Sequence, residues 1–401
     1  MKKIFGAGLV AVLMVLGTGL PAPVSAGVDS GSLMPTPDVG TLSNVLTSVS
    51  CVSSSWCAAV GNVNTGVSLQ TLAMVWDGSV WTRTVSPSPG SGDNSLQSVS
   101  CVSSTWCSAV GYAMVTSVSR TLALHWDGTT WSVVSTPNVD ASIHGLSSVS
   151  CVSENFCVAV GDHFEIGRPR TLTMTWDGST WTIVPSPNVS ADPNGFYSVS
   201  CVSTTWCTAV GEYFDGSTVQ PLIMRWNGSA WTIDSGLAAA SMYRSLTSVS
   251  CTTTTMCAAV GSHSPGSMQT MVATWDGRGW TIEADPLIAG AVLSSVSCVL
   301  PASCTFVGYH DISAPVAPGD RRTTVLTWDG SNWSTVPSPD VGSSSNTLTA
   351  VSCTSMHFCI AVGNFMVGTI DQTLALSLTS PDPSVPLTVG PGGTVPPTFT
   401  G

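Results

Sequence analysis

Cysteine is the residue type of this sequence that can take part in the most kinds of reaction. All 14 cysteines occur in one pattern, Cys-x5-Cys. Two nearby thiols can form a disulfide, bind zinc or take part in redox exchange. Zinc sites favour two pairs, each with about two to four intervening residues, whereas each pair here stands alone. A motif that recurs seven times is also more typical of a scaffold than of a redox centre. We therefore predict seven disulfides, which are Cys51–Cys57, Cys101–Cys107, Cys151–Cys157, Cys201–Cys207, Cys251–Cys257, Cys298–Cys304 and Cys353–Cys359.

A second set of candidate residues follows a glycine that recurs after each cysteine pair. These residues lie two positions after the glycine and are His163, Tyr213, His263 and His310. Asp162, Glu212 and Asp311 are their neighbours in the chain, and histidines together with carboxylates can hold a divalent metal. Because equivalent positions of separate repeats should lie too far apart to share one ion, we predict no metal and no cofactor.

A third set consists of long side chains that can donate several hydrogen bonds. Each repeat carries one of them just before its third apolar run, and they are Gln70, Arg120, Arg170, Gln220, Gln269, Arg322 and Gln372. One interpretation is that these side chains anchor a loop through their hydrogen bonds. The other is that they bind a polar or acidic ligand, and under it Arg120, Arg170 and Arg322 are candidate ligand-binding residues.

Signatures of the common enzyme classes are missing from the sequence. It contains no Gly-x-Ser-x-Gly, His-Glu-x-x-His, P-loop or Rossmann fingerprint. The acid pairs that glycosidases use cannot be chosen from sequence spacing, because they come from separate elements. Whether the protein is an enzyme therefore stays open, with the absence of activity favoured.

Aromatic and acidic residues of the repeat have a structural interpretation. All 15 tryptophans occupy three repeat positions, as Trp106, Trp126 and Trp131 illustrate in the second unit. Aromatic rings can stack on sugars, but rings placed identically in successive units are expected to pack between units or to stabilise a turn. The aspartate after the second tryptophan, Asp127 in this unit, should accept hydrogen bonds from the backbone of its own turn.

The positions of all these residues follow from a repeat of about 50 residues. Successive cysteine pairs begin 50, 50, 50, 50, 47 and 55 residues apart. In the third unit, residues 148–151 and 157–161 form two short runs, and residues 171–176 alternate large and small side chains. Asp177-Gly178 before residues 179–184 is a strong hairpin signal. Four short strands in each of seven units predict an all-β, seven-bladed β-propeller of antiparallel blades.

The two ends of the chain predict how the ring closes. The last unit has three strands and ends near Leu378, without the Trp-Asp-Gly turn and the fourth strand. Residues 33–40 near the N-terminus resemble residues 335–342, which end the sixth unit. We therefore expect the N-terminal segment to supply the fourth strand of the last blade, which would leave no open sheet edge.

The remaining segments predict export. Lys2 and Lys3, an apolar run and Val24-Ser25-Ala26 have the form of a signal peptide over residues 1–26. The propeller should span residues 27–380, and residues 381–401 should be a flexible tail rich in proline, glycine and threonine. No later run is long enough to span a membrane. Without its leader the chain has nine arginines and 23 acids, 9 − 23 = −14, which disfavours nucleic-acid partners.

Several propeller families resemble this chain. The turn Asp-Gly-Ser-x-Trp resembles the Asp-box of sialidase-type propellers, which has one more residue between Asp and Gly. Kelch repeats have a similar period but carry a Gly-Gly pair, and WD repeats are shorter. The units also resemble secreted bacterial repeats of the form SVSC…C-x-AVG…WDG-x-x-W over residues 33–378. A sialidase likeness would imply an arginine cluster and a tyrosine nucleophile, and no pattern here groups such residues.

These observations predict a secreted, disulfide-stabilised, monomeric binding module. Its short turns recur, whereas its loops between the second and third strands and between successive units vary. Because the antiparallel order places both variable loops at one end of the blades, that end is the expected binding surface for a glycan or a protein. The alternative is a hydrolase or lyase that acts on extracellular polysaccharide, like a sialidase-type propeller.

Overall fold

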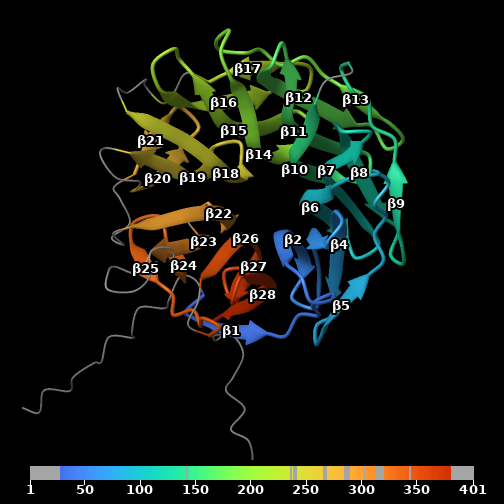
Figure 1. Ribbon diagram of the computed structural model, residues 1–401. Coiled ribbons are helices and arrows are strands. Elements are labelled where there is room, and N and C mark those ends of the chain that lie inside the picture. The colour runs from blue at the N-terminus through green and yellow to red at the C-terminus, as the bar shows by residue number, and fades with distance from the viewer. Residues whose placement is uncertain are drawn as a thin grey trace, which may run out of the picture.

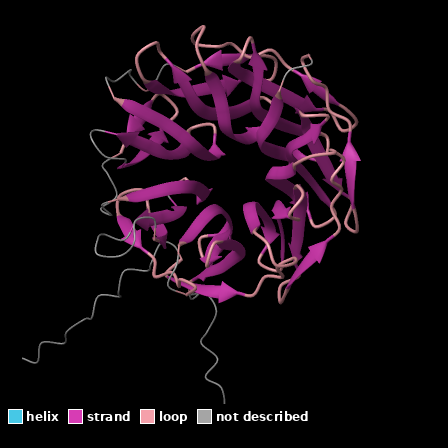
Figure 2. Ribbon diagram, in the orientation of Figure 1, coloured by secondary structure: helices cyan, strands magenta, loops and turns pink. Residues whose placement is uncertain are grey.

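The structure, a computed structural model, is a ring of seven four-stranded antiparallel sheets (Figures 1 and 2). It describes residues 28–140, 143–234, 237, 242–264, 269–283, 290–301, 303–311, 320–342 and 345–380. In this part of the chain every regular element is a strand. The predicted seven-bladed propeller is therefore confirmed, whereas the proposed leader and tail lie outside the described residues.

The blades follow one another along the chain, and we call the strands of each blade a, b, c and d. Blade 1 has β2 (Asn44–Ser53), β3 (Trp56–Asn64), β4 (Leu69–Trp76) and β5 (Trp81–Thr84). Blade 2 has β6 (Asn94–Ser103), β7 (Trp106–Val115), β8 (Val118–Trp126) and β9 (Trp131–Val134). Blade 3 has β10 (His144–Ser153), β11 (Phe156–Glu165), β12 (Arg168–Trp176) and β13 (Trp181–Ile183). Blade 4 has β14 (Asn194–Ser203), β15 (Trp206–Phe214), β16 (Val219–Trp226) and β17 (Trp231–Ile233).

The second half of the ring repeats this order. Blade 5 has β18 (Tyr243–Thr253), β19 (Met256–Ser264), β20 (Gln269–Trp275) and β21 (Trp280–Ile282). Blade 6 has β22 (Ala291–Leu300), β23 (Ser303–Asp311), β24 (Arg321–Trp328) and β25 (Trp333–Thr335). Blade 7 has β26 (Asn346–Ser355), β27 (Phe358–Val367) and β28 (Ile370–Thr379). Strands b and c reach further into the predicted variable loops than expected, so that several of these loops are tight hairpins, such as the one at Ile166-Gly167.

The N-terminal strand closes the ring, as predicted. β1 (Ser30–Met34) pairs antiparallel with β28 and so becomes strand d of blade 7 (Figure 1). Leu33 lies opposite Leu376 in the same register as Thr335 opposite Leu326 in blade 6. The strand itself ends before the proline-containing segment, which forms the connection to blade 1. β28 therefore has a partner on both sides.

A bulge in strand a explains the glycine that recurs in strand b. In blade 3 the register between β10 and β11 shifts between Leu146 and Ser148, opposite Gly161. A Cβ on Gly161 would lie 2.1 Å from the carbonyl oxygen of Gly145, which no side chain tolerates. The equivalent glycine of every blade has the same contact, because every blade has the same bulge. Only glycine lets strand b approach the bulge this closely.

The hydrophobic core lies between neighbouring blades. One cluster joins Ala58 and Val60 of blade 1 to Leu96, Leu124 and other buried residues of blade 2. Tryptophans contribute as predicted, because Trp106 of blade 2 packs in the cluster that contains the core of blade 3. Each blade thus buries its apolar side chains only when the next blade is in place, as in other repeat proteins.

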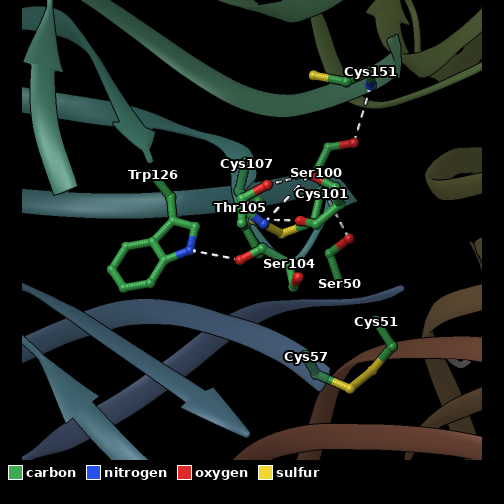
Figure 3. Close-up of a disulfide and its surroundings, with 12 residues drawn as sticks. Ser50, Cys51, Cys57, Ser100, Cys101, Ser104, Thr105, Cys107, Trp126 and Cys151 are labelled. Carbon is green, nitrogen blue, oxygen red and sulfur yellow. Dashed lines mark hydrogen bonds between the residues drawn. A yellow bond between two sulfur atoms is a disulfide. The ribbon is translucent and has the colours of Figure 1, made fainter. Parts of the chain in front are cut away.

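Two serines of the repeated Ser-Val-Ser-Cys motif join adjacent blades near the ring axis. The serine next to each first cysteine accepts a hydrogen bond from the backbone N–H of the equivalent cysteine in the next blade, at 2.9–3.0 Å (Figure 3). Cys51 N–H donates to Ser352 Oγ across the ring closure, so that seven such bonds form a closed circle. The other serine makes an equivalent bond to the valine of the next blade at six junctions, and Ala350 replaces it at the seventh.

One end of the blades carries the repeated turns. All seven predicted disulfides are present and join strands a and b beside their turn. Trp126 Nε1 donates to Ser104 O of this turn at 3.1 Å, which ties strand c to it (Figure 3). Asp127 Oδ1 accepts from the backbone N–H groups of Thr129 and Thr130, both at 2.8 Å, which confirms the expected turn structure. We call this the disulfide end.

Candidate functional site

The opposite end of the blades carries the b–c and d–a connections, and we call it the variable end. Most candidate residues lie there, because they follow the strand-b glycine or precede strand c. The three arginines contact the d–a connections. Arg120 Nη1 donates to Asp140 O at 2.7 Å, and Arg170 Nη1 donates to Ser190 O at 3.0 Å. Arg322 lies 3.7 Å from an oxygen of Asp340. These contacts match the loop-anchoring interpretation and leave ligand binding a prediction.

The candidate histidines lie in three different blades. The ring of His163 stacks on that of His144, with centroids 5.9 Å apart. Burial lowers the pKa of His163, which favours the neutral imidazole near neutral pH. His310 Nδ1 hydrogen-bonds Thr324 Oγ1 at 2.9 Å. His263 lines a cavity with Arg244. Among the described residues, no three metal-binding side chains lie close enough together to hold an ion.

A pocket of about 190 Å³ at the variable end combines acidic and aromatic groups. It lies between blades 3 and 4, where β11 of one blade meets β14 and β15 of the other. Its walls contain two carboxylates, two phenols and two phenylalanine rings, which belong to Asp162, Glu212, Tyr197, Tyr213, Phe164 and Phe214. It therefore places Tyr213, a predicted candidate, beside the two acids that the sequence analysis considered only as neighbours of histidines.

Burial perturbs the two central groups of this pocket in the same direction. It raises the pKa of Asp162 from 3.8 to about 6. The carboxylate is therefore mostly ionised at neutral pH, but its ionised form is less stable than that of an aspartate in water. It also raises the pKa of Tyr197, and the charge of Glu212 together with a hydrogen bond to it adds to this effect. The Tyr197 hydroxyl therefore stays protonated and donates to Glu212. The site has a negative charge in an apolar setting.

Tyr197 was not predicted as a site residue, although it departs from the repeat at its position. It occupies the bulge position of strand a, where the other blades have threonine, serine or glutamine. At this position Thr47 and Thr349 donate to backbone carbonyls of their own and the adjacent blade. Tyr197 is 41% exposed instead and reaches Glu212. Comparing each repeat position across the blades would have identified it as an exception.

Two further pockets are larger but chemically plainer. One of about 510 Å³ lies at blade 1, and its lining consists of apolar, hydroxyl and amide residues, including Gln70, together with Arg83. Another of about 280 Å³ adjoins β1 and is mainly apolar, with Leu33, Met34 and Phe365 in its walls. The second pocket also contains Asp38, which accepts hydrogen bonds from Thr373, and neither pocket combines two carboxylates with two phenols as the pocket between blades 3 and 4 does. The smaller pocket is therefore the strongest candidate site.

Comparison with known proteins supports the fold and leaves the site to be argued from its chemistry. The chain is similar to a solved structure described as "YCF48 bound to D1 peptide", with a TM-score of 0.54 and 13% sequence identity. The likeness covers 88% of this chain and 100% of that one. At this identity it shows a shared propeller fold and no more. No model of a protein family matches the chain, and no curated protein matches it either.

Proposed function

We propose that this protein is an exported binding module whose variable end binds a polypeptide. The observation that carries the proposal is the difference between the ends of the blades. The disulfide end repeats the same turn in blade after blade, whereas the variable end holds different loops and a pocket with acids and aromatic rings. Repeated turns stabilise a scaffold, and unrepeated concave surfaces with a few polar groups are typical of binding sites.

Two observations support the compartment and the ligand class. Seven disulfides and no free cysteine among the described residues suit an oxidising environment, in agreement with the predicted leader. None of the described residues forms a helix able to cross a membrane. The structure of similar fold is described as bound to a peptide, and a peptide suits a pocket walled by aromatic rings.

A binding screen tests this proposal. Residues 27–401, with the disulfides formed, are applied to peptide and glycan arrays. We expect peptide ligands, and we expect Glu212→Gln at the variable end to weaken them. Val80→Thr is the matched control, because Val80 is 54% exposed in a turn at the disulfide end. Binding to glycans alone, or binding lost equally in both variants, would contradict the proposal.

The second candidate function is hydrolysis of an extracellular polysaccharide. The observation that favours it is the paired acids, because Asp162 has a pKa raised to about 6 and shares a pocket with Glu212. A general acid needs a raised pKa, and its partner carboxylate acts as a base or nucleophile. Turnover of any polysaccharide on the glycan array, lost in both Asp162→Asn and Glu212→Gln, would establish this function instead.

A further inference from the structure

The junction between blades 1 and 2 shows which residues the repeat normally places where the pocket lies between blades 3 and 4. There Asn62 of β3 donates from Nδ2 to Ser95 Oγ of β6 at 3.0 Å, so that both neutral groups are satisfied. At the junction between blades 3 and 4 the equivalent residues are Asp162 and Gly195. An acid replaces the amide, and the hydroxyl that faced it is missing.

The replacement leaves Asp162 without a partner and with space beside it. Its carboxylate accepts no hydrogen bond and forms no ion pair within the part of the chain that the structure describes. A Cβ added to Gly195 would lie 4.0 Å from Asp162 Cβ, an ordinary contact distance, and would meet nothing closer. The equivalent asparagine of blade 7, Asn364, donates to Asp371 at 2.6 Å. Asp162 thus differs from the asparagines of blades 1 and 7 in both charge and surroundings.

A second acid increases the negative charge of this space. Glu212 follows the strand-b glycine of blade 4 and lies opposite Gly195 in the register of β14 and β15. Tyr197 donates one hydrogen bond to it, which leaves further acceptor capacity on its carboxylate. Each carboxylate in a partly buried pocket costs free energy unless a positive charge compensates it.

The residues that line the pocket favour an organic cation over a metal ion. Calcium takes about six to eight oxygen ligands, whereas aromatic rings and prolines line this pocket. Aromatic faces attract ammonium and guanidinium groups. The chain uses this combination for its own arginines. The guanidinium of Arg225 lies 4.1 Å from the Trp275 ring centre and pairs with Asp234, and that of Arg321 lies 4.1 Å from Tyr309 and pairs with Asp311.

We infer that the pocket between blades 3 and 4 binds the cationic side chain of a lysine or arginine in the polypeptide ligand. Asp162 and Glu212 supply the charge, Tyr197 orients Glu212, and the rings of Tyr213 and Phe164 cover the alkyl part. At about 190 Å³ the pocket fits one side chain, since sites for whole small molecules begin at roughly 300 Å³. The inference rests on the proposed function and names the group that the variable end recognises.

An NMR titration of the isotope-labelled, disulfide-intact chain tests the inference. The probes are the N-acetyl methylamides of lysine, arginine and norleucine, together with glucosamine. We expect the lysine or arginine probe to shift the resonances of Gly195 and Tyr213, and the uncharged norleucine probe to leave them unchanged. Shifts with glucosamine alone would overturn the assignment to a side chain, and shifts with none of the probes would overturn the inference.

Two substitutions identify the groups responsible. Gly195→Ser restores the hydroxyl that Ser95 provides at the junction of blades 1 and 2, and Asp162→Asn restores the neutral amide. Each should weaken binding by about tenfold or more, because the serine hydroxyl competes with the ligand for the carboxylate of Asp162 and the asparagine removes its charge. Gly279→Ser is the matched control, since a Cβ there meets nothing within 4 Å and Gly279 lies at the disulfide end. Amide spectra report that each variant is folded.

The results also separate this inference from the proposed function. If peptides from the array bind the variable end and neither Gly195→Ser nor Asp162→Asn weakens them, the inference is wrong and the proposed function stands. If no peptide on the array binds while the lysine probe binds the wild-type pocket and fails in both variants, the pocket recognises a cationic group as inferred, whereas the proposed polypeptide ligand is wrong. Unchanged probe affinity in both variants contradicts the inference in either case.

Discussion

The two ends of the blades differ in the surroundings of an aspartate, and these surroundings shift its pKa in opposite directions. At the disulfide end, Asp127 accepts hydrogen bonds from two backbone N–H groups and from Thr129 Oγ1, and these bonds lower its pKa. At the variable end, burial raises the pKa of Asp162, and no described donor faces it. The ionised carboxylate stabilises the fold at one end and destabilises it at the other. A free-energy cost that the scaffold does not require is a mark of a binding site.

The contrast between the two aspartates also shows how a repeat can be interpreted. Asp127 has counterparts in other blades with the same bonds, and Asn227 accepts equivalent bonds in blade 4. Such a position is explained by the geometry of its own turn. Asp162 has counterparts in position, but only Glu212 of blade 4 shares its acidic chemistry, because the other blades place asparagine, tyrosine or serine there. Departure from the repeat, rather than residue type alone, is what marks a candidate for function.

The largest expected effect comes from the disulfide end. Each disulfide closes a ring between cysteines six positions apart, which should contribute about 2 kcal/mol to the free energy of unfolding. Cys151→Ala with Cys157→Ala should lower this free energy by that amount, and reduction of all bridges should lower it on the order of 10 kcal/mol. Denaturant unfolding with and without reductant measures both. Equal stability in the two conditions would show that the bridges do not hold the ring.

A smaller effect is expected where the serines join the blades. Ser148 Oγ accepts from Val199 N–H in a buried setting, so that Ser148→Ala should cost about 1–3 kcal/mol of unfolding free energy. Ala350→Ser supplies the hydroxyl that the ring-closing junction lacks, and it should add about 1 kcal/mol. Thermal unfolding of the two variants checks the opposite signs. A loss of stability in both would show that the seventh junction has no room for this bond.

The smallest effect compares the two aspartates directly and depends on pH. The pKa of Asp127 is lower in the folded state, so its contribution to stability is present above the unfolded value of 3.8 and is lost as the pH falls further. The pKa of Asp162 is raised from 3.8 to about 6, so its ionisation lowers stability as the pH rises through that range. At neutral pH, Asp127→Ala should lower the melting temperature and Asp162→Asn should raise it.

Unfolding curves at acid pH complete this comparison. Below pH 3.8 both carboxylates are largely protonated in the unfolded chain, and the difference between Asp162→Asn and the wild type should disappear. The difference for Asp127→Ala should become smaller for the same reason. Shifts of the same sign for both variants at neutral pH would mean that the two ends do not differ in the way described.

Much of the scaffold could be predicted because the same cysteine spacing and strand pattern recur in seven units. The cysteine spacing predicted every disulfide, and the incomplete last unit predicted that residues near Leu33 complete blade 7. Arg120 and Arg170 hydrogen-bond to the d–a connections, as the loop-anchoring interpretation expects, whereas their role in ligand binding stays a prediction. The extent of the b–c hairpins was underestimated, because polar loop sequences can continue a strand pair when the register permits.

The candidate site could not be predicted in the same way. Asp162, Gly195 and Tyr197 belong to two blades, and their significance depends on which residue of one blade faces which residue of the next. The number of blades, their disulfides and the closure of the ring follow from the sequence alone, because local strand periodicity and a fixed repeat encode these features. That an acid, a missing hydroxyl and a tyrosine meet in one pocket is visible only in the folded chain, since contacts between blades depend on packing in space.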